Sequence, residues 1–134
     1  MIEELPGTVR EKLRSVKELT KANTGLILNL ALNYGSRREM VRAVRAISSD
    51  AKDGRIGLDG IDEEMLSSYL DTKGLSDPDI LIRTSGEKRL SNFLLWQLSY
   101  AELFFLDKHW PDFRKEDISG VIGEYLGRER RYGG

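Results

Sequence analysis

The sequence predicts an α/β fold in which helices flank part of a largely parallel β-sheet. Two apolar runs carry this prediction: residues 26–32 read LILNLAL, and residues 80–82 read ILI. Strands that are buried on both faces have such nearly unbroken apolar runs. Helical periodicity separates the two runs, which indicates a right-handed crossover between parallel strands. Because 134 residues suffice for one domain with its own core, we treat residues 1–134 as a single unit.

The first predicted element is an amphipathic helix that begins after Pro6-Gly7. Its apolar residues recur at the three-to-four spacing of one helix face, and the polar residues between them solvate the other face. Residues 23–25 read NTG and end the helix. The apolar positions are Val9, Leu13, Val16 and Leu19.

Two more helices are predicted between the apolar runs. Ser36 and Glu39 match a capping box at the start of the first, with Ser36 as the N-cap. Asp62 is the expected N-cap of the second, which covers residues 63–70. The junction before the first helix also carries an arginine pair at 37–38, and its backbone donors could hold an anion. An ordinary capped helix with solvated arginines is the alternative, and the residue types alone favour it.

The pattern is less regular after the second apolar run. We expect a short helix over residues 93–99, a third strand at 103–106 and a last helix over 114–130. Glycines inside the last helix indicate close packing against another backbone, since each costs about 1 kcal/mol relative to alanine. The expected buried face of this helix consists of Ile118, Val121, Ile122, Tyr125 and Leu126, and its glycines are Gly120, Gly123 and Gly127.

The predicted strands are too few for the sheet that the first apolar run requires. Residues 26–32 need neighbouring strands and cover on both faces. The chain opens on a helix and supplies only about three candidate strands. We therefore expect part of a larger sheet whose N-terminal strands are missing from this chain.

Composition excludes several classes of function. With 21 basic and 22 acidic residues the net charge is −1, so nucleic-acid binding is not expected. Without cysteine there can be no disulfide, zinc thiolate or cysteine nucleophile, and the single histidine, His109, has no partner for a transition-metal site. No apolar run reaches the roughly 18 residues of a membrane span. No signal peptide is recognisable, so we expect a cytoplasmic protein.

The most informative stretch is residues 77–102. Its apolar strand ends in Arg83-Thr84-Ser85-Gly86, and Arg89 and Ser91 follow closely. Ligands of open α/β sheets bind beyond the carboxyl ends of the strands. Arginine forks and hydroxyl groups suit phosphate oxygens, so these residues predict an anion site. A polar loop whose arginines pair with nearby carboxylates remains an equally open alternative.

Four motifs resemble the cis-prenyltransferases, and most closely the undecaprenyl diphosphate synthase-like members. They are residues 32–37, 77–102, 110–113 and 128–134, which follow the order of the family across nearly the whole chain. The resemblance implies that family's α/β fold, with this chain as the C-terminal part of a single catalytic domain. It also implies an enzyme that joins isopentenyl diphosphate to an allylic diphosphate and so extends a cis-polyprenyl chain. Because the product is a membrane lipid, a peripheral place at the membrane is compatible with a cytoplasmic protein.

The resemblance also implies roles for particular residues. Asn33 and Arg37 belong to a family motif to which we assign no direct contact. The Arg-x-Gly motif at 131–133 would reach the substrate of a second subunit in a homodimer. The implied substrate-binding residues are Arg83, Arg89, Leu90 (through its backbone), Ser91, Arg131 and Gly133, and the implied Mg²⁺ ligand is Glu102.

One family segment has no counterpart in this sequence. Asp-Gly-Asn-Gly-Arg-Trp supplies the family's catalytic aspartate and its allylic diphosphate loop, and it does not occur here. We therefore expect no catalytic residue in this chain and interpret it as a C-terminal fragment that is inactive alone. The alternative is a non-catalytic partner subunit that donates its Arg-x-Gly motif to an active prenyltransferase. Such subunits usually lack the signature that Arg83, Arg89, Ser91 and Glu102 form here.

Overall fold

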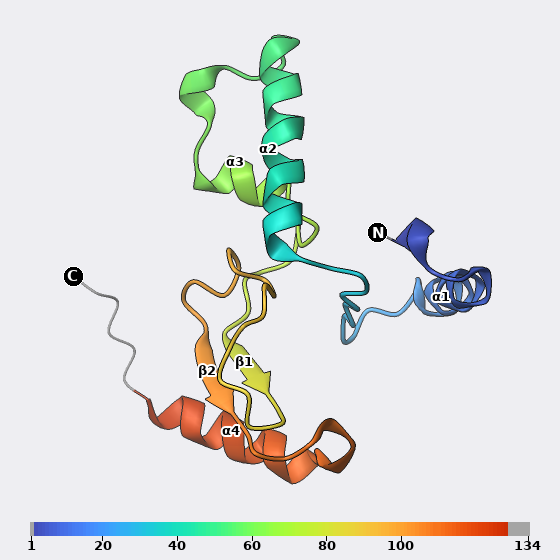
Figure 1. The fold of residues 1–134 in the computed structure, drawn as a ribbon, viewed down its shortest axis with the longest axis vertical. Helices are drawn as coiled ribbons and strands as arrows, with labels where there is room; N and C mark the ends of the chain where they lie inside the picture. Colours follow the sequence, from blue (N-terminus) through green and yellow to red (C-terminus); the bar gives the residue numbers. More distant parts are fainter. Residues whose placement is uncertain (1, 129–134) are drawn as a thin grey trace.

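The computed structural model describes residues 2–128, which contain four α-helices and a two-stranded sheet (Figure 1). None of these helices is both long enough and apolar enough to cross a membrane. The predicted helices after Gly7 and Asp62 and the strands at 80 and 103 are confirmed, with small shifts in their bounds. The elements are α1 (Gly7–Thr20), α2 (Ser36–Lys52), α3 (Glu63–Ser68), β1 (Ile80–Arg83), β2 (Glu102–Phe105) and α4 (Lys115–Gly127), with 3₁₀ turns at Ile2–Glu4, Leu58–Gly60 and Trp110–Asp112.

Strands β1 and β2 pair in parallel, and their register determines which side chains share a face. Arg83 lies beside Phe105 at the carboxyl end of the pair, whereas Glu102 begins β2 at the other end. Successive side chains of a strand point to opposite faces, so Glu102 shares a face with Phe104 and Arg83 belongs to the other face. Helix α4 covers the Phe104 face, where the Arg128 guanidinium lies 4.2 Å from the centre of the Phe104 ring.

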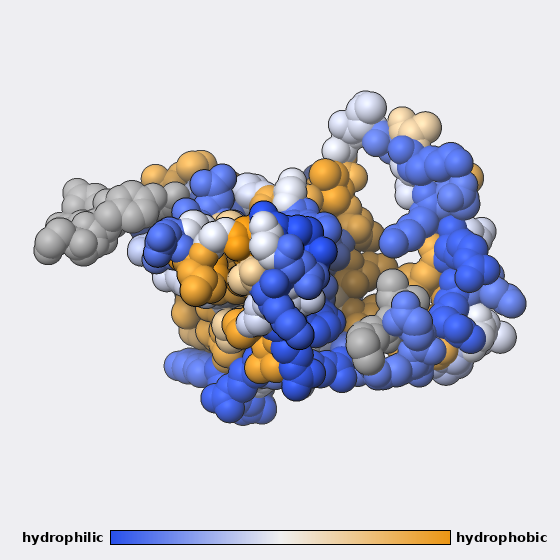
Figure 2. Space-filling view, turned by 90° about the horizontal axis from the view of Figure 1, so that it is seen from above, coloured by the Kyte–Doolittle hydropathy of each residue, from blue (hydrophilic) through white to orange (hydrophobic). Residues whose placement is uncertain are grey.

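Residues 26–32 do not form the predicted strand. They join α1 to α2 as an irregular segment, and Leu26, Ile27 and Leu28 are 93%, 72% and 75% exposed. A strand exists only where a neighbouring strand shares its backbone hydrogen bonds, and the sheet of the described residues contains β1 and β2 alone. These residues have the composition of a buried strand but no neighbours to pair with. Figure 2 shows hydrophobic atoms at the surface beside a hollow in the molecule.

Two local predictions about helix positions are also wrong. Gly35, not Ser36, is the N-cap of α2. Ser36 is the first helical residue and is fully buried, and its hydroxyl accepts the N–H of Leu95 at 3.0 Å instead of capping the helix. Residues 93–99 form a series of turns in place of a helix. Leu94 there has a φ of 42°, a left-handed conformation that a right-handed helix excludes. The predicted cap at Asp62 is confirmed, since its carboxylate accepts the N–H of Met65 at 2.8 Å.

The core is small, and α4 contributes little to it. Val121 is buried and Tyr125 is partly buried, but Ile118, Ile122 and Leu126 are 43%, 44% and 76% exposed, so most of the predicted inner face is wrong. The sheet beneath α4 has only two strands in the described chain, which leaves little surface for the helix to cover. Among the described residues, nothing lies within 4 Å of a Cβ built on any glycine of α4, so the predicted close packing against another backbone does not occur within this part of the chain. The remaining buried hydrophobic residues are Ala43, Ile47, Leu70, Leu98 and Phe104.

The start of α4 offers a pH-dependent contribution to stability. Asp117 accepts hydrogen bonds from Lys108 Nζ at 2.6 Å and from the Arg114 N–H at 2.8 Å, and these bonds lower its pKa, with Lys108 as the main cause. A carboxylate with a lowered folded-state pKa stabilises the fold above its ordinary value of 3.8 and loses this effect as the pH falls through the lower value. We therefore expect Asp117→Asn to melt below the wild type at neutral pH. The difference should shrink in melts at increasingly acid pH, and a constant difference would contradict this assignment.

Candidate functional site

The carboxyl end of β1 presents Arg83 on a fixed piece of backbone. Arg83 is partly buried and makes no ion pair or side-chain hydrogen bond with the residues that the structure describes. Behind it, the Ser85 N–H donates to the carbonyl of Lys108 at 2.7 Å, and the Gly86 N–H donates to that of Leu106 at 2.9 Å. These bonds tie the loop to the chain that follows β2. The guanidinium donors of Arg83 are therefore available at a well-anchored strand end.

The loop also carries Arg89 and Ser91. Arg89 forms an ion pair with Glu87, and the Arg89 side chain is 63% exposed. The alternative of a polar loop with internally paired arginines therefore holds for Arg89 but not for Arg83. Exposed ion pairs contribute little stability, so an anionic ligand can replace Glu87 at small cost. Ser91 is exposed, and Leu90 between the two is partly buried.

This loop docks on the amino end of α2. The Ser36 N–H donates to the carbonyl of Asn92 at 2.9 Å, and the Arg37 N–H donates to Asn92 Oδ1 at 2.9 Å. The N–H groups of Ser36 and Arg37 are thus already bonded within the chain, which argues against a second anion site at this helix end. Arg37 and Arg38 are exposed, as the alternative of solvated arginines expects, although Arg38 also donates to the Asn33 carbonyl. Sequence reasoning missed Asn92. Its residue type favours helix capping, but nothing local indicates a helix that begins 56 residues earlier.

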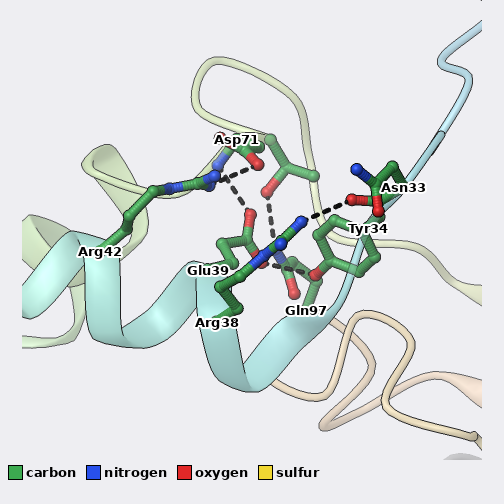
Figure 3. A network of polar contacts seen from close by, with 8 residues as sticks. Asn33, Tyr34, Arg38, Glu39, Arg42, Asp71 and Gln97 are labelled. Atoms are coloured by element: carbon green, nitrogen blue, oxygen red, sulfur yellow. Dashed lines mark hydrogen bonds and ion pairs between the residues drawn. The ribbon is translucent and has the colours of Figure 1, made fainter. Parts of the chain in front are cut away.

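A second unforeseen feature is the buried polar network around Glu39, which is 2% exposed (Figure 3). Its carboxylate accepts hydrogen bonds from the Tyr34 hydroxyl at 2.5 Å, the Asp71 N–H at 2.7 Å and the Gln97 amide at 3.4 Å. Burial raises the pKa of Tyr34 to about 12, and the hydrogen bond to Glu39 is the second cause. The network joins α2 to the turn after α3 and to the segment that follows the Arg89 loop. Glu39 is therefore a structural centre and not the predicted capping residue.

A cavity of about 360 Å³ opens beside this network. The irregular residues 29–35 line it together with Arg38 and Arg42 of α2. Arg42 pairs with Asp71 at 2.6 Å, and Arg38 donates to the Asn33 carbonyl at 2.8 Å. Figure 3 shows both guanidinium groups turned toward these partners. Both arginines are therefore engaged within the chain, which distinguishes them from Arg83.

Glu102, the implied magnesium ligand, lies apart from Arg83. The strand register separates the two by three residues, about 10 Å along the sheet, and by opposite faces. The Glu102 carboxylate accepts a hydrogen bond from Arg128 Nη1 at 2.6 Å. No cluster of three or more potential metal ligands occurs among residues 2–128. Magnesium often takes one carboxylate and completes its shell with water and phosphate oxygens, so Glu102 fits as a single protein ligand. A magnesium ion there would compete with the Arg128 guanidinium for the Glu102 carboxylate.

Helix α4 leads toward the implied Arg-x-Gly motif. Arg128 bonds to Glu124 and Glu102, which raise the pKa of its guanidinium above the ordinary value. Arg128 is the last residue that the structure describes. Arg131 and Gly133 lie outside the described residues, so their predicted roles stay predictions.

Comparisons with known proteins agree on one family. A family model described as putative undecaprenyl diphosphate synthase matches residues 1–133. An isoprenyl transferase of Bacillus thuringiensis subsp. konkukian is 52% identical over 130 residues, which cover 97% of this chain and 50% of that protein. A ditrans,polycis-undecaprenyl-diphosphate synthase, (2E,6E)-farnesyl-diphosphate specific, of Micrococcus luteus is 50% identical over 133 residues, 99% of this chain and 53% of its own length. The chain thus spans about half the length of these curated relatives.

Solved structures give the same answer. A lavandulyl diphosphate synthase from Lavandula x intermedia, in complex with dimethylallyl diphosphate, has a TM-score of 0.93 at 36% identity and is matched over 98% of this chain and 57% of that one. A probable undecaprenyl diphosphate synthase from Campylobacter jejuni has a TM-score of 0.81 at 37% identity, over 100% of this chain and 60% of that one. These matches bear out both the α/β fold and the resemblance drawn from the motifs. The chain belongs to the undecaprenyl diphosphate synthase family of cis-prenyltransferases.

Proposed function

We propose that this chain is the isopentenyl diphosphate-binding portion of a cis-prenyltransferase. The observation that carries the proposal is Arg83, whose guanidinium stands at an anchored strand end without an internal partner among the described residues. A diphosphate carries several negative charges, and its oxygens match the planar donor fork of arginine. Arg89 and Ser91 follow Arg83 in the same loop, six and eight residues later in the sequence. They add a second guanidinium and a hydroxyl donor.

In the proposed complex these residues bind and orient the diphosphate. Arg83 donates to one group of oxygens, and Arg89 exchanges its exposed contact with Glu87 for the ligand. Ser91 donates a neutral hydrogen bond, and the backbone of Leu90 lies against the same group. Anchoring of the loop through backbone hydrogen bonds keeps these donors in place before the ligand arrives, which lowers the entropic cost of binding.

We assign the magnesium ion of the site to Glu102. When bound, such an ion would neutralise part of the diphosphate charge. Glu102 and Arg83 lie on opposite faces and at opposite ends of the sheet, so one diphosphate contacts both most simply when they belong to two copies of the chain. This geometry favours a homodimer, in which Arg131 and Gly133 would also act on the substrate of the partner.

Turnover requires more than this chain contains. The Asp-Gly-Asn-Gly-Arg-Trp segment is absent from the 134 residues, so we assign no residue here to ionisation of the allylic substrate. The alternative of a non-catalytic partner subunit gains no support. The curated relatives reported above are isoprenyl transferases, and the chain keeps Arg83, Arg89, Ser91 and Glu102.

Isothermal titration calorimetry with isopentenyl diphosphate tests the proposal. We expect binding at low salt, competition by pyrophosphate and no heat from isopentenol, which has the same hydrocarbon without the charge. Incubation with an allylic diphosphate should give no elongated product. A chain that fails to bind isopentenyl diphosphate, with or without Mg²⁺, contradicts the proposed site. Measurable elongation contradicts the absence of catalytic residues.

A further inference from the structure

The motif at residues 32–37 has no assigned contact with substrate, yet the structure gives it a specific neighbour. Its last three residues, Gly35, Ser36 and Arg37, form the seat on which Asn92 rests. Asn92 accepts the N–H of Ser36 with its carbonyl and the N–H of Arg37 with its side chain, both at 2.9 Å. Ser36 in turn accepts the N–H of Leu95 at 3.0 Å. The motifs at 32–37 and 77–102, which are far apart in sequence, are therefore joined by these three hydrogen bonds.

Asn92 caps α2 from outside the helix. A helix leaves its first N–H groups without partners, and the N-cap residue normally satisfies one of them with its own side chain. The N-cap of α2 is Gly35, which has no side chain to do so. The amide oxygen of Asn92 takes this role for the second helical residue, Arg37. The side chain that caps α2 is thus that of Asn92, which belongs to the loop that carries Arg89 and Ser91.

Gly35 matters to this arrangement through its closeness to the Asn92 amide and not through its own backbone conformation. Its φ is −162°, an extended value that any residue adopts. A Cβ at this position would lie 2.9 Å from Nδ2 of Asn92, so any side chain there would push the Asn92 amide out of its capping geometry. A side chain at residue 35 would therefore compete with the Asn92 amide for the same space.

The cap also fixes an unusual backbone conformation next to the proposed ligand. Ser91 and Asn92 have φ values of 50° and 64°, the left-handed region. Asparagine tolerates this region, whereas serine adopts it at some cost. Bonds from α2 to Asn92 hold both residues in this conformation, and Ser91 is the residue immediately before the cap. Movement of Asn92 would thus be passed directly to Ser91 and, three residues earlier in the chain, to Arg89.

We propose that Asn92 is a positioning residue, which holds the Arg89–Ser91 segment in its diphosphate-binding conformation by capping α2, with Gly35, Ser36 and Arg37 as its seat. The inference rests on the proposed function of this loop. It also gives the motif at 32–37 a role beside the substrate loop, although the N–H groups of Ser36 and Arg37 are already bonded within the chain.

The test compares Asn92→Ala and Asn92→Asp by calorimetry with isopentenyl diphosphate. Asn92→Ala should weaken binding about tenfold, because the loop loses its side-chain bond to the amino end of α2 and its donors lose their alignment. Asn92→Asp retains an acceptor for the Arg37 N–H at a helix amino end, where negative charge is favourable, and should keep most of the affinity. Gly35→Ala leaves Asn92 in place but displaces its amide, so it should reproduce the loss in Asn92→Ala.

A matched control separates positioning from general stability. Asp62→Ala removes another helix cap, from α3, far from the loop in sequence. It should lower the melting temperature to a similar extent as Asn92→Ala and leave diphosphate affinity unchanged. Amide hydrogen exchange should show faster exchange of the Arg37 N–H in Asn92→Ala and wild-type protection in Asn92→Asp.

The outcomes distinguish the inference from the proposed function. A wild-type chain that does not bind isopentenyl diphosphate overturns the proposed function and the inference with it. Wild-type binding that Asn92→Ala and Gly35→Ala leave unchanged overturns the inference alone. Equal loss of affinity in Asp62→Ala and Asn92→Ala also overturns it, because the effect would then follow stability and not position.

Discussion

Replacing Glu39 by alanine should lower the free energy of unfolding by roughly 3 kcal/mol. Glu39 is 2% exposed and serves three donors, the Tyr34 hydroxyl, the Asp71 N–H and the Gln97 amide. Each donor that is left buried without an acceptor costs about 1 kcal/mol or more. The loss should be large for this chain because its core contains few buried side chains to offset it. Chemical denaturation monitored by circular dichroism measures the change.

Two further variants show whether the cause is the buried carboxylate. Glu39→Gln keeps the shape and one acceptor, so we expect it to lose only about 1 kcal/mol. Glu11→Ala removes an exposed glutamate from α1 and should leave the free energy of unfolding nearly unchanged. If Glu39→Ala unfolds at the same denaturant concentration as Glu11→Ala, the network in Figure 3 does not stabilise the fold.

Tyr34 provides an independent spectroscopic readout of the same contact. Because Glu39 contributes to its raised pKa of about 12, Glu39→Gln should bring the phenol closer to its ordinary value of 10. The folded chain holds this proton more tightly than the unfolded chain does. The corresponding stability is fully present below pH 10 and is lost as the pH rises through about 12, so it adds no pH dependence to denaturation near neutral pH. An ultraviolet titration, with Tyr34→Phe subtracted to isolate this residue, measures the shift.

Elements whose formation depends on local pattern were predictable from the sequence. Helix α1 follows from apolar spacing, the start of α3 from the capping residue Asp62, and β1 from a short apolar run before Arg83. Residues 26–32 have an equally clear strand pattern, but a strand also needs a neighbour, and the described chain supplies none for them. The exposed face of α4 has the same cause, because the sheet beneath it is only two strands wide.

The candidate site also contains residues that the local pattern predicts and residues whose role depends on distant contacts. Arg83, Arg89 and Ser91 could be singled out because their residue types follow a strand and suit phosphate. The contacts of Asn92 and Glu39 could not, because their partners lie 55 and 58 residues away in the sequence. A polar residue at a helix start is equally compatible with a local cap and with a distant contact. Only the folded chain distinguishes these possibilities.

Arg83→Ala should weaken the binding of isopentenyl diphosphate by about 10- to 100-fold, or roughly 1.4–2.7 kcal/mol. The estimate corresponds to the loss of a charged hydrogen-bonding group that has no competing partner among the described residues. Arg83→Lys keeps the charge but loses the planar fork, so it should fall between alanine and the wild type. Calorimetry at two salt concentrations should also show a weaker salt dependence for Arg83→Ala, because one fewer ionic contact is screened.

Arg10→Ala is the matched control for this prediction, because Arg10 is an exposed arginine of α1. It removes the same charge from the chain and should leave the affinity for isopentenyl diphosphate unchanged. If affinity falls only in Arg83→Ala, the cause is the position of Arg83 and not the net charge of the chain. Arg89→Ala should have a smaller effect than Arg83→Ala, since Arg89 must first give up its contact with Glu87. Unchanged affinity in a folded Arg83→Ala variant would mean that the carboxyl end of β1 does not hold the diphosphate. In that case Arg89 and Ser91 alone would have to account for any binding that remains.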